Sequence, residues 1–150
     1  MFIKRKDFEK IFSEFVIKNK DILAINRIRE LHKDIIDIAV RLVSLDFINY
    51  VRITDEIIVA SSEATGTRIK KPITTMNHAT AVGVSIIYHI DYKALDFYEI
   101  NSPVKGNGNK MISAILTNLP KDWKLYVTID WSGGFWKRME EKYSDREWII

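Results

Sequence analysis

The stretch ALDFYEINSPVKGNGNKMISAILTNL, residues 94–119, contains the signals that decide the predicted fold. Its first part alternates apolar and polar side chains, which predicts a β-strand over residues 95–100. Its last part has apolar residues at intervals of three and four, which predicts a helix over residues 111–119. The segment Lys105-Gly106-Asn107-Gly108-Asn109-Lys110 lies between them. The sequence therefore predicts a strand, a glycine-rich loop and a helix in direct succession.

A junction of this kind is suited to binding an anion. Glycine allows the backbone to turn and to approach a ligand closely. The first amides of the following helix have no partners within the helix and lie at the positive end of its dipole. Lys105 and Lys110 add positive charge beside them. The alternative interpretation is a turn that only reverses the chain.

Residues 100–110, Ile-Asn-Ser-Pro-Val-Lys-Gly-Asn-Gly-Asn-Lys, resemble the signature of the GNAT superfamily of acyl-CoA N-acyltransferases. That signature is a strand ending in an apolar-x-Pro-x-x-Arg-Gly-x-Gly-x-Gly/Ala segment, followed by a helix. Here Lys105 replaces the usual Arg or Gln, the proline comes one place late, and Lys110 replaces the last small residue. Downstream, residues 123–129 are similar to the family's next strand and residues 133–139 to its Phe-Tyr-Glu-Lys-Leu helix.

The resemblance implies an α+β fold, with a GNAT-like mixed, mostly antiparallel sheet flanked by helices and a truncated carboxyl-terminal end. We expect one domain over residues 1–150. The resemblance also implies acetyl-CoA as co-substrate. In the family, pantetheine lies in a wedge beside the end of the central strand, which matches Ile100, Asn101 and Ser102. The pyrophosphate would meet the amides of Lys105, Gly106, Asn107, Gly108, Asn109 and Lys110.

Acyl transfer from a thioester to an amine benefits from a general base and a general acid. Asp96 and Glu99 are the carboxylates of the predicted central strand and are the candidate bases, although each is alternatively a surface charge. Alternate residues of a strand face opposite sides, so both reach one cleft only if a bulge intervenes. The family's acid is commonly a tyrosine of its last helix. The matching residue here is Trp136, which has no proton to donate at a useful pKa.

The rest of the chain predicts helices over residues 7–18 and 22–44, the second with Asp21 as its N-cap. Strands are predicted over residues 1–4, 49–54, 56–61, 81–90, 123–129 and 148–150. Residues 62–80 are rich in threonine and basic residues, which indicates a solvated hairpin tip or a flap over the substrate. His32 is expected to be a hydrogen-bonded or exposed structural histidine.

Composition limits the function classes. The chain has 150 residues, 47% of them hydrophobic, a formal net charge of +3 and no cysteine. The absence of cysteine excludes disulfides, thiolate metal sites and a cysteine nucleophile, and a cytoplasmic location is the expectation. The charge suits a polyanionic small molecule and does not indicate nucleic-acid binding. No run reaches membrane-spanning length.

Three hypotheses remain. The first is an N-acetyltransferase that moves the acetyl group of acetyl-CoA to a primary amine. The second is a non-catalytic GNAT-like module that binds a protein or nucleic acid, and the third is an unrelated α+β nucleotide-binding or nucleic-acid-binding protein. A homodimer is compatible with each of them.

Overall fold

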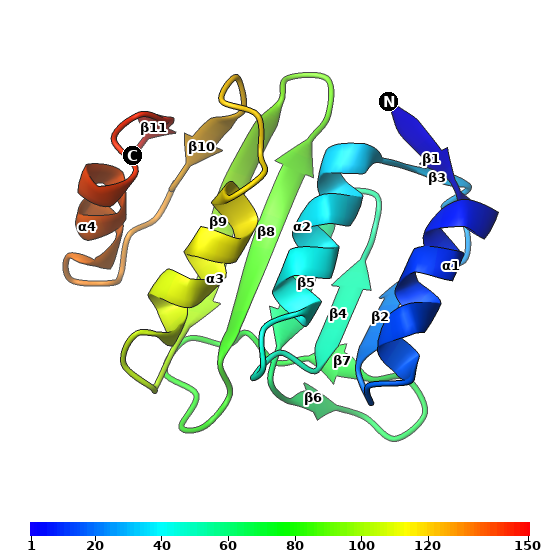
Figure 1. Ribbon diagram of the computed structural model, residues 1–150. Coiled ribbons are helices and arrows are strands. Elements are labelled where there is room, and N and C mark those ends of the chain that lie inside the picture. The colour runs from blue at the N-terminus through cyan, green and yellow to red at the C-terminus, as the bar shows by residue number, and fades with distance from the viewer.

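A seven-stranded sheet in the order β11-β10-β9-β8-β5-β4-β2 forms the centre of the fold in the computed structural model, which describes residues 1–150 (Figure 1). The strands along the sheet are β11 (Glu147–Ile149), β10 (Lys124–Tyr126), β9 (Ala94–Asn101), β8 (Gly83–His89), β5 (Ile57–Ser61), β4 (Tyr50–Ile53) and β2 (Asp21–Ala24). The four middle strands, β9, β8, β5 and β4, pair antiparallel. At the two ends of the sheet, β2 pairs with β4, and β10 with β9 and β11, in parallel.

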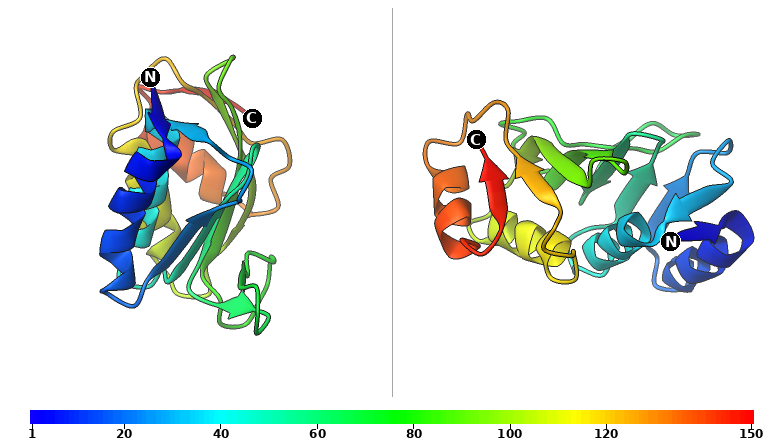
Figure 2. Two further views of the ribbon diagram at one scale, coloured as in Figure 1. Left: turned by 90° about the vertical axis from the view of Figure 1, so that its right-hand side faces the viewer. Right: turned by 90° about the horizontal axis from the view of Figure 1, so that it is seen from above.

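All four helices lie along one face of this sheet (Figure 2). They are α1 (Arg5–Val16), α2 (Lys33–Val43), α3 (Asn107–Leu116) and α4 (Phe135–Lys142). Each buries one apolar stripe, and together with the covered face of the sheet they enclose a core cluster of 33 buried residues. The predicted α+β class, with a mixed sheet flanked by helices, is confirmed. None of the helices has the length and hydrophobicity that a bilayer crossing requires.

Two small antiparallel sheets complete the structure. β1 (Phe2–Lys4) pairs with β3 (Glu30–His32), and β6 (Ala64–Thr65) pairs with β7 (Lys71–Pro72). The predicted amino-terminal strand is therefore present, although it lies outside the main sheet.

The helix predicted over residues 22–44 is wrong in its first half. Residues 21–24 form β2, which pairs with β4, and the following loop leads to β3 before α2 begins at Lys33. The Arg5 guanidinium holds this loop, because it donates hydrogen bonds to the carbonyl oxygens of Ala24, Ile25 and Ile28. Asp21 is not an N-cap: its carboxylate pairs with Arg52, 3.0 Å away, on the neighbouring strand.

Two further boundaries differ from the sequence prediction. α3 begins at Asn107 rather than after Lys110, so most of the glycine-rich segment belongs to the first turns of the helix. β10 covers only residues 124–126 of the predicted 123–129, because the chain leaves β9 beyond Tyr126.

Residues 62–80 are held against the end of β9. The Asn101 side chain accepts a hydrogen bond from the Asn77 amide and donates to the carbonyls of His78 and Ala81. Thr74 is buried and donates to the Glu99 carboxylate. The basic tip with β6 and β7 lies below β4 in the view of Figure 1.

His32 is the N-cap of α2, which agrees with the structural role expected for it. Its Nδ1 accepts a hydrogen bond of 3.0 Å from the Asp34 amide, so the ring must be unprotonated at this nitrogen. Burial lowers the pKa of His32, and this effect outweighs the opposing effect of the Asp34 carboxylate. Asp34 also accepts a hydrogen bond from the indole of the fully buried Trp123, which joins the start of α2 to the chain before β10.

We predict that folding stability falls with acidification through this cap. The unfolded chain takes up a proton on His32 at about pH 6.5, whereas the folded chain does so only at lower pH. The stabilisation from the cap is therefore complete above about pH 6.5 and is lost as the pH falls through the lowered pKa of the folded state. His32→Asn, a capping residue that does not titrate, should remove this dependence.

Denaturant unfolding at a series of pH values measures the effect. The stability difference between the parent and His32→Asn should change by about 1 kcal/mol below pH 6.5. The matched control is His89→Asn, because His89 is exposed on β8. A pH-independent difference for His32→Asn would contradict the capping role.

Candidate functional site

β9 and β10 separate after a short parallel pairing, and this separation creates the candidate site. β10 pairs with β9 only over residues 94–96, although β9 continues to Asn101. Beyond Tyr126, the chain keeps contact with β11 through a hydrogen bond from the Val127 amide to the Ile149 carbonyl. The segment that follows then loops out on the face of the sheet that no helix covers (Figure 2). One edge of β9 is therefore open along residues 97–101.

A cavity of about 200 Å³ occupies this opening, and we call it the wedge cavity. Its walls are residues 97–101 of β9, part of the 129–136 segment, and Met76 and Asn77 from the segment before β8. The predicted pantetheine-binding residues Ile100 and Asn101 line the cavity, and Ser102 follows them directly. The structure therefore places Ile100 and Asn101 in the wall of the wedge cavity, whereas Ser102 is not part of it.

A β-bulge lies at the middle of β9, within the stretch that lines the wedge cavity. Ser85 of β8 pairs with Glu99, and the next residue, Ile86, pairs with Phe97. Tyr98 therefore has no partner on β8. Such an extra residue changes which side chains share a face of the strand.

The bulge places the two candidate bases on the same face. Asp96 pairs with Ile87, and Glu99 pairs with Ser85. Ile87 and Ser85 are two residues apart on β8 and so point the same way, as do the residues directly opposite them. Asp96 and Glu99 consequently both face the side that the helices leave open, which satisfies the condition stated from the sequence.

Both carboxylates line a second cavity of about 300 Å³, which we call the acceptor cavity. It adjoins the wedge cavity and shares six lining residues with it: Met76, Phe97, Tyr98, Glu99, Ile129 and Trp131. Ile87, Asp96 and Thr128 line the acceptor cavity alone. Glu99 thus lies where the two cavities meet, whereas Asp96 belongs to the acceptor cavity.

The two carboxylates differ in their hydrogen bonds. Glu99 accepts one from Thr74 at 3.3 Å. The Oδ2 atom of Asp96 accepts one from the Thr128 hydroxyl at 3.1 Å. The Oδ1 atom of Asp96 is buried and has no hydrogen-bond partner at all. A buried acceptor without a donor is uncommon and destabilises the protein that contains it.

The amino terminus of α3 follows the wedge closely in the chain. Gly106 is the N-cap residue and has a φ of +91°, a left-handed conformation that strongly favours glycine. Three of the six amides from residue 105 to residue 110 have partners within the chain, namely those of Asn107, Gly108 and Lys110. The amides that remain free for an anion are those of Lys105, Gly106 and Asn109.

Gly108 has a packing role that the sequence did not predict. Its amide donates to the Ser102 hydroxyl at 3.1 Å, so Ser102 already caps this position. A Cβ atom on Gly108 would lie 3.0 Å from the ring of Phe135, which is the first residue of α4. Gly108 therefore allows α4 to pack closely against the start of α3.

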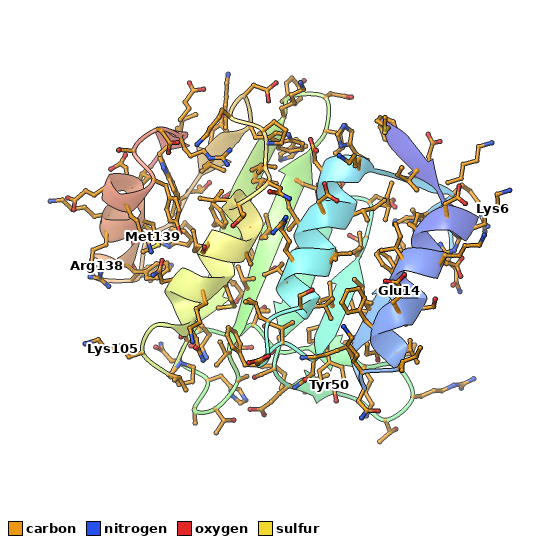
Figure 3. All side chains as sticks on the ribbon, in the orientation of Figure 1. Lys6, Glu14, Tyr50, Lys105, Arg138 and Met139 are labelled. Carbon is orange, nitrogen blue, oxygen red and sulfur yellow. The ribbon has the colours of Figure 1, made fainter.

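The remaining predicted phosphate-binding residues point in different directions. Asn109 and Lys110 line an open groove of about 620 Å³ between α2 and α3, and Asn109 accepts a hydrogen bond from Lys142. Lys105 is exposed and extends outward from the loop before α3, on the side away from α2 (Figure 3). Of the two lysines, only Lys110 lines this groove.

Trp136 is a packing residue as well as a wall of the wedge cavity. Its side chain is 3% exposed and its ring centroid lies 4.8 Å from that of Phe97. Phe135 and Trp148 pack against the same ring. This position explains its apolar character without any part in proton transfer.

Met76, Thr128 and Trp131 line the acceptor cavity, and the sequence analysis did not identify them. Trp131 is 73% exposed. A tryptophan within the turn-forming segment Asp-Trp-Ser-Gly-Gly, residues 130–134, was the available signal, because turns lie on the surface and large apolar side chains there often mark binding sites.

We predict that Trp136→Tyr lowers the free energy of unfolding by about 1–3 kcal/mol, because the smaller ring leaves a cavity in the aromatic cluster. Trp131→Tyr should change it by less than about 0.5 kcal/mol, since a surface ring loses few contacts. Urea denaturation of the two variants measures both effects. Equal stability of the two variants would contradict the packing role of Trp136.

Comparison of the chain with protein-family models, with curated proteins and with solved structures found no match in any of the three.

Proposed function

We propose that the protein is an N-acyltransferase that moves an acetyl group from acetyl-CoA to a primary amine by direct transfer. The observation that carries this proposal is the opening between β9 and β10, which is lined by two carboxylates and followed by a helix amino terminus with free amides. The pantetheine would lie along the open edge of β9, and the pyrophosphate at Lys105 and Gly106. The resemblance of residues 100–110 to the GNAT signature supports the same assignment.

The reaction requires few groups. The acceptor ammonium first loses a proton, and its nitrogen then attacks the thioester carbon. The C–N bond forms and the C–S bond breaks, the nitrogen gives up a second proton, the leaving thiolate takes up one proton, and the overall reaction releases one proton. Glu99, at the junction of the two cavities, is the assigned base. A thiolate is a sufficiently good leaving group to depart without a dedicated acid, because thiols have a pKa of about 8.5. Trp136 therefore has no proton-transfer role in this scheme.

One observation favours the alternative function, a non-catalytic GNAT-like module that binds a protein or nucleic acid. The Gly108 amide already donates its hydrogen bond to the Ser102 hydroxyl, and the Phe135 ring fills the space beside that glycine. These contacts restrict the phosphate site to the outer part of the loop. In this alternative, the protein would bind neither CoA nor acetyl-CoA.

Calorimetric titration with acetyl-CoA and CoA tests the proposed co-substrate. We expect binding of both, and Lys105→Ala should weaken it about three- to tenfold at low salt because an exposed cation near the phosphates is lost. The loss should shrink at high salt. Lys110→Ala is the matched control, since Lys110 lines the groove between α2 and α3. Absence of CoA binding, or an equal loss from both variants, would contradict the assigned phosphate site.

The base assignment makes a separate prediction. Glu99→Gln should lower kcat by roughly 10²–10⁴-fold, the usual contribution of general acid–base catalysis, and should leave CoA affinity unchanged. Thiol release from acetyl-CoA over a panel of amines measures the rate. Glu140→Gln controls for net charge, because Glu140 is exposed on α4. Full activity of Glu99→Gln would exclude Glu99 as the base.

A further inference from the structure

We infer that the acceptor cavity binds a small protonated amine with an apolar or aromatic body, and that Asp96 is the anchor for its ammonium group. This inference rests on the proposed acyl transfer for its place in a reaction, and it names the class of acceptor. Asp96 lies in the wall of this cavity together with Glu99. The Thr128 hydroxyl donates a hydrogen bond to the Oδ2 atom of Asp96 and so fixes the position of its carboxylate.

An ammonium group in the cavity pairs with this carboxylate and with that of Glu99, which lines the same cavity. It has N–H donors and a positive charge, and charge-assisted hydrogen bonds are stronger than neutral ones. No lysine, arginine or histidine lines the acceptor cavity, so no side chain of its wall can neutralise the two carboxylates. A cavity with two carboxylates and no cation favours a cationic ligand.

The other residues of the cavity wall indicate that the rest of the ligand is apolar or aromatic. Tyr98 is 59% exposed and Trp131 is 73% exposed, and Met76, Ile87 and Ile129 complete an apolar surface around the carboxylates. Aromatic faces attract a cation and also cover an apolar group. A flexible polyamine or a sugar amine would leave this apolar surface without matching contacts. An alkyl or aryl amine fills it.

The volume of the cavity limits the class of amine further. The cavity volume of about 300 Å³ lies at the lower end of the range for small-molecule sites, roughly 300–1,000 Å³. A compact amine fits this space with its nitrogen toward Asp96. Glu99 lies between that position and the wedge cavity, so the nitrogen reaches the thioester past the assigned base. Asp96 is thus assigned to binding and Glu99 to proton transfer.

Binding of 2-phenylethylamine to the whole protein, in the absence of CoA, tests this inference. Calorimetry and tryptophan fluorescence, to which the exposed Trp131 contributes, provide two readouts. We expect 2-phenylethylamine to bind, and both 2-phenylethanol, which lacks the charge, and spermidine, which lacks the apolar body, to bind at least about tenfold more weakly. Asp96→Asn should weaken amine binding by about 10- to 100-fold, the effect of losing one charge-assisted hydrogen bond.

The matched control is Asp91→Asn, because Asp91 is an exposed carboxylate in the turn before β9. It should leave amine affinity unchanged. Circular dichroism verifies that Asp96→Asn folds, and we expect its melting temperature to be close to that of the parent, since the asparagine oxygen can still accept the hydrogen bond from Thr128.

Equal binding of the amine and the alcohol, or unchanged amine affinity in Asp96→Asn, would overturn the inference. Tight binding of spermidine with weak binding of 2-phenylethylamine would overturn the assigned class. CoA titration stays a separate measurement. If CoA binds and the amine does not, the acceptor class is wrong and the proposed transfer stands; if the amine binds through Asp96 and CoA does not, the proposed transfer is wrong.

Discussion

β9 pairs with β8 along its whole length but with β10 over three residues only, and the candidate site depends on this difference. The unpaired edge of β9 provides backbone groups at one wall of the wedge cavity. The bulge at Tyr98 then turns Asp96 and Glu99 to one face. Bulges often occur beside functional sites because they redirect a side chain at small structural cost. If residues 96–99 formed a regular strand without the bulge, one of the two carboxylates would point into the core among Phe97 and Trp136, where an unpaired charge is strongly unfavourable.

Loops around this sheet are held by long cationic side chains that donate to backbone carbonyls. Arg5 holds the loop after β2, Lys20 donates to the carbonyls of Leu45 and Ile48 before β4, and the buried Arg146 donates to those of Leu116 and Pro120 after α3. Burial lowers the pKa of both Lys20 and Arg146. These contacts satisfy carbonyl groups that irregular segments leave without partners. They also explain why residues 22–32 are not helical: the backbone there bonds to Arg5 and to β4.

Much of the fold could be predicted from the sequence, because the patterns that indicate helices and strands lie within short segments of the chain. Alternation over residues 49–61 and 81–101 identified four strands of the main sheet, and spacing at three and four identified α1 and α3. α4 was expected from the resemblance of residues 133–139 to the GNAT helix. The helix predicted over residues 22–32 was wrong because the apolar residues there, Ile22, Ile25, Ile28 and Leu31, have helical spacing. The pairing of β2 with β4 is a tertiary contact, and periodicity in the sequence does not report it. At the site, Asp96 and Glu99 were identifiable by residue type. The cavity wall formed by Met76 and Trp131 could not be predicted, because it depends on where the irregular segments that contain these residues lie on the open face of the sheet.

The two proposed functions differ most in how they account for Asp96 and Glu99. The bulge turns both carboxylates toward one cavity, and no lysine, arginine or histidine lines that cavity. A module that only displays a surface has no use for two like charges in one cavity, because they repel each other. A site that binds a cation gains from them, because an ammonium group pairs with both. The contacts of Ser102 and Phe135 near Gly108 limit how deeply a phosphate can enter, but they do not close the wedge between β9 and Trp131. The support for transfer is therefore stronger at the end of the opening where an amine would bind than at the phosphate site.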